Sequence, residues 1–138
     1  MRLSRWVVAS IAAAVLGLAV MVPVALAAEV DLHAHLSGST AFPRATGFSS
    51  YERGDGGREV EVTVRNVGRL TGTRVTFFVA GQRIGTVVVS SAGTAHINRE
   101  TEHGQFVPFA SAGDRVSVKR TSNGHLVARG TYFRERED

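Results

Sequence analysis

The stretch Glu59-Val60-Glu61-Val62-Thr63-Val64-Arg65 decides the fold class of this 138-residue chain. Valine occupies every second position, and the residues between the valines are charged or polar. Because successive side chains of a β-strand point to opposite faces, this pattern predicts a strand with one buried and one solvated face. The same alternation recurs along the chain, and no segment after residue 28 carries a sustained helical repeat. We therefore expect an all-β fold.

Turn residues divide this region into about eight short strands. The expected strands are 29–37, 45–53, 58–66, 73–80, 83–90, 94–100, 114–121 and 125–133. Asn123-Gly124 predicts a type I′ hairpin turn. Ala80-Gly81-Gln82-Arg83 suits a type II′ turn, because Gly81 is the first of its two central residues, and Ser91-Ala92-Gly93 predicts a further hairpin. A single antiparallel β-sandwich or small β-barrel would limit the exposed strand edges. We expect one of these two architectures for residues 28–133.

The inward positions of these strands define an expected core. All are apolar and in phase within their strands: Val60, Val62, Val64, Val75, Phe77, Val79, Ile97, Val116 and Val118. Phe78 is out of phase with Phe77, so its side chain should point to the opposite face of the sheet.

The first 27 residues resemble an export signal in composition. Arg2 and Arg5 precede the apolar segment Val7 to Val22, and Ala25-Leu26-Ala27 is typical of a signal peptidase site. We expect cleavage after Ala27, and hence a secreted or cell-envelope protein. An uncleaved membrane anchor is the alternative, because an apolar segment of this length can span a bilayer. At the other end, residues 134–138 are expected to form a disordered charged tail.

Composition excludes several classes of function. The chain contains no cysteine, so disulfides, thiol catalysis and cysteine-ligated zinc are excluded. Without residues 1–27, the chain has 14 basic and 12 acidic residues. Its arginines are scattered along the sequence rather than gathered on one element. We therefore expect no nucleic-acid partner. Gly-x-Ser-x-Gly, a phosphate-binding loop and His-Glu-x-x-His are all missing, so we also expect no catalytic site and no cofactor.

Two groups of ionisable residues are candidates for chemistry. Asp31, His33 and His35 share one strand face, where two imidazoles and a carboxylate would suit Zn²⁺ or Cu²⁺. A more distant histidine would have to complete such a site, and a plain solvated face is the simpler reading. Candidates for that further ligand are His96, His103 and His125. The second group is a dense cluster that would suit acid–base catalysis, although mixed charges in a polar loop are usually only solvated. Its members are His96, Glu100, Glu102 and His103.

An apolar segment, Gln105 to Ala110, stands where a polar loop would be normal. Phe106 and Phe109, together with Phe78, are the candidate partner-binding residues. The alternative, which we favour for the two loop phenylalanines, is that they fold back over the open end of the fold. The expected function is an exported, non-catalytic binding or structural module. Its partner would be a protein or another envelope component, and it would contact a membrane only if the first segment is retained.

Overall fold

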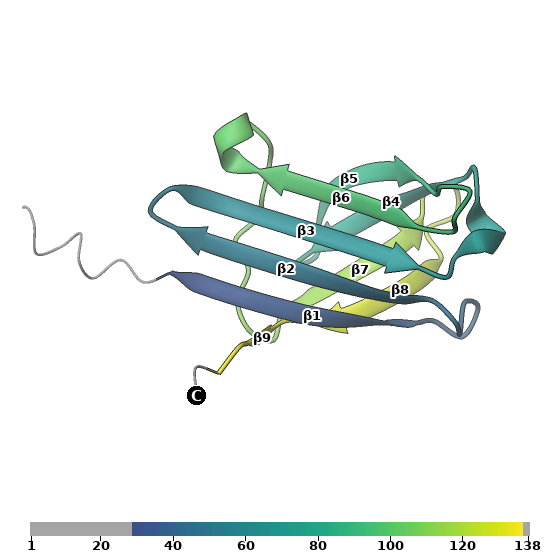
Figure 1. The fold of residues 1–138 in the computed structure, drawn as a ribbon, viewed down its shortest axis with the longest axis horizontal. Coiled ribbons are helices and arrows are strands. Elements are labelled where there is room, and N and C mark those ends of the chain that lie inside the picture. The colour runs from purple at the N-terminus through teal and green to yellow at the C-terminus, as the bar shows by residue number, and fades with distance from the viewer. Residues whose placement is uncertain (1–28, 137–138) are drawn as a thin grey trace, which may run out of the picture.

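The computed structural model describes residues 29–136, which form an antiparallel sheet rolled into a nearly closed barrel (Figure 1). The strands are β1 (Val30–Gly38), β2 (Thr46–Gly54), β3 (Gly57–Arg65), β4 (Arg74–Val79), β5 (Gln82–Val88), β6 (Ala95–Glu100), β7 (Arg115–Arg120), β8 (Leu126–Thr131) and β9 (Phe133–Arg134). Two 3-10 turns, η1 (Gly68–Leu70) and η2 (Thr101–His103), lie between strands. The all-β prediction is confirmed, and β9 is the one strand not expected.

The described part of the chain has no helix long and apolar enough to cross a membrane. The expected export signal and the last two residues of the expected tail lie outside the described residues. Arg134, which the sequence assigns to that tail, belongs to β9 and pairs with Leu32 of β1.

The strands follow the order β5-β4-β7-β8-β1-β2-β3-β6, and β9 pairs with β1. In Figure 1, β1, β2, β3 and β6 lie side by side, and β4, β7 and β8 cross behind them. β2 and β3 form a hairpin in which Gly54 opposes Gly57 across the two-residue loop Asp55-Gly56. This loop marks one end of the barrel, and the site described below gathers there.

The two ends of the sheet, β5 and β6, meet at a seam. The hairpin expected at Ser91-Ala92-Gly93 is wrong. The chain does reverse there, but β5 and β6 do not pair with each other, because they are the opposite edges of the sheet. Beside the turn, the Ser90 N–H donates to the Thr94 carbonyl at 2.9 Å. Further along, the Arg99 Nε–H donates to the Ile84 carbonyl at 3.1 Å. A register shift between β4 and β5 leaves Ile84 opposite no residue of β4, so this arginine side chain bridges the seam.

All nine residues predicted for the core are buried, each with 3% or less of its surface exposed. The period-two alternation therefore gave the correct inward phase for the strands tested. Phe78 is half-buried, and the Lys119 Nζ lies 5.0 Å from its ring centroid.

Both tyrosines of the chain lie in the core, and each hydroxyl is satisfied. The Tyr51 hydroxyl donates to the Pro108 carbonyl at 2.8 Å and accepts from the Ala110 N–H at 3.2 Å. The Tyr132 hydroxyl lies 2.8 Å from Ser49 Oγ, which itself donates to the Glu61 carbonyl. Because the serine proton is used there, Tyr132 is the donor to Ser49. Burial raises the pKa of both tyrosines, which keeps the two hydroxyls protonated at neutral pH.

The two predicted turn types are wrong. Ala80 and Gly81 both have positive φ, at 51° and 76°, so this two-residue loop is type I′. Asn123 has no positive φ, and only Gly124 is left-handed, at 71°. The reason is loop length: Arg120 bonds to His125 across four residues, and a loop of that length needs a left-handed residue only at its end.

Ala80→Asn should stabilise the protein, because asparagine tolerates the left-handed conformation better than alanine does. We expect the free energy of unfolding to rise by about 0.5–1 kcal/mol, the usual size of such backbone effects. Urea denaturation would measure the change. Ala92→Asn is the matched control, since Ala92 lies in an exposed turn without positive φ and should have no effect. A loss of stability in Ala80→Asn would contradict the type I′ assignment.

Candidate functional site

A row of carboxylates crosses the outer face of four adjacent strands. Asp31 of β1 lies opposite Glu52 of β2, Glu52 lies opposite Glu59 of β3, and Glu59 lies opposite Glu100 of β6. We call these four residues the acidic row. Directly opposed residues of antiparallel strands have Cβ atoms about 4.5–5.5 Å apart, and like charges at that distance destabilise the sheet. The row therefore costs stability in the isolated protein.

The acidic row borders an open hollow of about 370 Å³ at the β2–β3 hairpin end of the barrel. Three more acidic residues line the hollow, Glu29, Asp55 and Glu102, against two basic ones, Arg53 and Arg58. Within residues 29–136, every ion pair with a carboxylate is made by a histidine, and no lysine or arginine comes within 4.0 Å of one. Negative charge at this end of the barrel is therefore largely uncompensated.

The pKa of Glu100 is affected by its place in the row. Its pKa is raised above the ordinary glutamate value, first by loss of hydration and then by the hydrogen bond and negative charge of Glu59. His103 Nδ1 lies 3.0 Å from the Glu100 carboxylate and partly offsets this shift. A cation placed against the row would favour the ionised form of Glu100.

The structure brings together only part of the proposed catalytic cluster. Glu100 and Glu102 line the hollow, and His103 contacts Glu100. His96 instead lies beside β3, with its Nδ1 2.8 Å from Thr63 Oγ1. The His103 side chain is 69% exposed and the Glu100 side chain 25%, so water reaches the pair mainly from the histidine side. Such a pair can exchange protons with solvent.

The segment Gln105 to Ala110 closes the hollow end of the barrel. Its buried residues are Val107, Pro108 and Ala110, whereas Phe106 and Phe109 are 55% and 68% exposed. The expectation that both phenylalanines fold back is therefore wrong. Tyr51 binds the main chain at Pro108 and Ala110, which leaves the intervening Phe109 pointing outward.

Arg58 connects Phe109 to the hollow. The Arg58 Nε–H donates to the Val107 carbonyl at 2.8 Å, and its guanidinium carbon lies 4.1 Å from the Phe109 ring centroid. An exposed aromatic ring thus stands beside the acidic hollow. Phe78, the third candidate contact residue, lies on β4 against Lys119 of β7. It is therefore not one of the aromatic residues beside the hollow.

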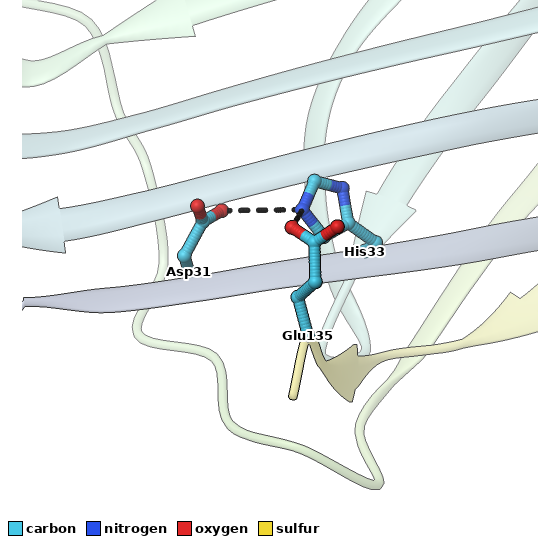
Figure 2. A group of neighbouring side chains, drawn as sticks. All are labelled: Asp31, His33 and Glu135. Carbon is cyan, nitrogen blue, oxygen red and sulfur yellow. Dashed lines mark ion pairs between the residues drawn. The ribbon is translucent and has the colours of Figure 1, made fainter. Parts of the chain in front are cut away.

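A second group forms around His33 (Figure 2). His33 Nε2 lies 3.5 Å from Asp31 Oδ1 and 3.3 Å from Glu135 Oε2. His35 takes no part: its ring centroid lies 5.7 Å from that of Phe133 and 6.0 Å from that of Phe48. None of the more distant histidines in the described region joins the group.

Glu135 is the residue of this group that sequence reasoning missed. It follows β9, and the pairing of Phe133 with His33 carries it over the start of β1. Strand alternation could not reveal this contact, because β8 and β9 are interrupted at Tyr132. The run of β-forming residues Thr131 to Phe133 was the available signal that the last strand continued.

No protein-family model and no curated protein matches the sequence. Function has therefore to be inferred from the chemistry of the site.

Proposed function

We propose that this chain is an exported, non-catalytic binding domain, and that its acidic row binds a basic segment of a protein partner. The observation that carries the proposal is the row itself, in which four carboxylates stand in register with no lysine or arginine of residues 29–136 within 4.0 Å. Cationic side chains of a partner would offset the repulsion that the row imposes on the free domain.

The dimensions of the row suit an extended peptide. Neighbouring strands lie about 4.8 Å apart, so four strands place the outer carboxylates about 14 Å apart. An extended segment rises about 3.3 Å per residue, so four or five residues would cover this distance. Lysine or arginine at alternate positions of such a segment would face the carboxylates.

Exposed aromatic residues supply the apolar part of the proposed contact. Phe109 stands beside the hollow through its contact with Arg58, and Phe106 is exposed on the same segment. Aromatic side chains are enriched at protein interfaces, where they bury a large area for little loss of conformational freedom. We therefore infer a partner segment that combines basic and apolar residues.

The composition of residues 1–27 supports the proposal of export, and the exposure of His103 supports the proposal of a non-catalytic role. Acid–base catalysis by Glu100 and His103 would need a bound substrate and exclusion of water. The His103 side chain is 69% exposed, so water reaches the imidazole in the free domain.

A labelled peptide would test the binding step. The probe is a fluorescein-labelled octapeptide of alternating lysine and phenylalanine, followed by fluorescence anisotropy at low salt. We expect binding that weakens as the salt concentration rises, because exposed charges are screened. Glu59→Gln should weaken binding by up to about fivefold, the equivalent of about 1 kcal/mol for one exposed ion pair.

Glu61→Gln is the matched control for that measurement. Glu61 lies on the same strand and face as Glu59 but one row further along, opposite Ser50 and Asn98. It should weaken binding less than Glu59→Gln does. Recognition by the acidic row would be contradicted if the two substitutions weakened peptide binding equally, or if the affinity did not change with salt concentration.

Capture from the envelope fraction of the host would identify the natural partner. The bait is the chain from residue 28 onward, compared with its Glu52→Gln/Glu59→Gln/Phe109→Ser variant. We expect at least one protein with a basic segment to be retained by the unmodified bait and lost from the variant. If both baits retained the same proteins, the result would argue against partner binding at the acidic row and Phe109.

A further inference from the structure

Asp31, His33 and Glu135 converge although more than 100 positions separate Asp31 from Glu135 in the sequence. β1 presents Asp31 and His33 on its outer face, and β9 pairs with β1 through Leu32 and His33. Glu135, the residue after β9, therefore reaches over the imidazole ring of His33 (Figure 2). One ligand atom from each of the three residues lies within 4.8 Å of the other two.

The two short distances match the edges of a metal coordination tetrahedron. Zinc binds histidine nitrogen and carboxylate oxygen at about 2.0–2.2 Å, which separates neighbouring ligand atoms by about 3.3–3.6 Å. His33 Nε2 lies 3.5 Å from the Asp31 oxygen and 3.3 Å from the Glu135 oxygen. The Asp31 and Glu135 side chains are 55% and 73% exposed, so their carboxylate oxygens have room to approach each other around a bound ion.

A shared proton accounts for this arrangement less well than a metal ion does. The Nε2 atom of His33 is fully buried and has no hydrogen-bond partner among residues 29–136. A protonated imidazole has one Nε2 proton, which cannot be donated in good geometry to two carboxylates at once. A divalent ion would accept the Nε2 lone pair and both carboxylates together, and its charge would balance theirs.

The imidazole ring is held in place by its neighbours. Its centroid lies 5.7 Å from that of Phe48 and 6.2 Å from that of Phe133. These rings restrict the orientation of His33 and place an apolar surface beside the ligand atoms. An apolar surface beside a metal site limits the access of solvent to the ion.

We propose that Asp31, His33 and Glu135 bind one Zn²⁺ ion, with a fourth position open to water. Three protein ligands with an open fourth position form an established zinc arrangement. Because Glu135 follows the last strand and the other two ligands lie on the first, the ion would fasten the end of the chain to β1. The proposal stands apart from peptide binding, although Asp31 belongs to both sites.

Zinc titration of the chain from residue 28 onward would test the site. The protein is purified without an affinity tag, treated with EDTA, dialysed, and titrated with ZnCl₂ by calorimetry, with the thermal midpoint followed in parallel. We expect one ion per chain and a midpoint that rises with the logarithm of the zinc excess over the dissociation constant. His33→Gln and Glu135→Gln should each weaken zinc binding by at least about tenfold, since each removes a ligand.

Two controls separate this site from its alternatives. His35→Gln should keep zinc binding, and its loss there would show His-x-His chelation and overturn the assignment of Glu135. Glu52→Gln should also keep zinc binding while it weakens peptide binding, so the two proposals fail independently. Calcium binding of similar strength that survives His33→Gln would show a carboxylate-only site and overturn the proposal.

Discussion

Phe77→Ala should lower the free energy of unfolding by about 3–5 kcal/mol, the range measured for large-to-small aromatic substitutions in cores. Phe77 is fully buried on β4, between Gly85 of β5 and Val118 of β7. The glycine has no side chain with which to fill the cavity that the substitution leaves. Since a domain of this size is stable by about 5–15 kcal/mol, the loss would consume a large part of its stability.

Phe78→Ala provides the comparison within the same strand. Phe78 is half-buried on the outer face, where it contacts the Lys119 ammonium group. Its loss should cost about 1 kcal/mol or less. Urea denaturation of the two variants would give the difference. Similar losses for Phe77→Ala and Phe78→Ala would contradict the inward and outward phases of β4.

Tyr51→Phe is expected to lower the free energy of unfolding by about 2 kcal/mol. The substitution keeps the ring but leaves the Pro108 carbonyl and the Ala110 N–H without a partner in the buried end of the barrel. A buried polar group left unsatisfied typically costs about 1–3 kcal/mol. Hydrogen exchange at the Ala110 amide should also become faster, because the hydroxyl that holds it is gone.

Tyr132→Phe is the control for this loss. It removes a bond to Ser49 Oγ, but the serine still donates to the Glu61 carbonyl. We expect a smaller cost of about 1 kcal/mol and unchanged exchange at Ala110. Faster exchange at Ala110 in both variants would show that loss of either hydroxyl loosens the barrel as a whole, rather than releasing this segment alone.

Local pattern predicted the strands well, because burial of one face imposes a period of two wherever it occurs. The valines of β3 and Phe77 of β4 are examples. Turn types were predicted less well, because they depend on the number of residues between paired strands. Asn123-Gly124 has the composition of a type I′ turn but occupies part of a four-residue connection.

The candidate sites depend on register between distant strands, which composition does not contain. Glu100 was identified only as part of a local cluster and Glu59 not at all, and only the pairing of β3 with β6 places the two side by side. His33 and Asp31 were identified from their spacing on one strand, whereas Glu135 required β9 to pair with β1. Long-range pairing therefore created both sites from residues that look solvated.

β5 and β6 are not joined by a strand ladder, and the Arg99 side chain bridges them instead. Elsewhere, paired strands are joined by repeated backbone bonds, so separating them means breaking a ladder. To open the sheet at the seam, the arginine must leave the Ile84 carbonyl near the middle of β5, and the backbone bond from the Ser90 N–H to the Thr94 carbonyl must break beside the turn. Opening there would expose two unpaired strand edges, which is the arrangement through which proteins exchange strands or associate edge to edge. The Arg99 side chain occupies the Ile84 carbonyl, so this acceptor on the edge of β5 is not available to an added strand while the bond persists.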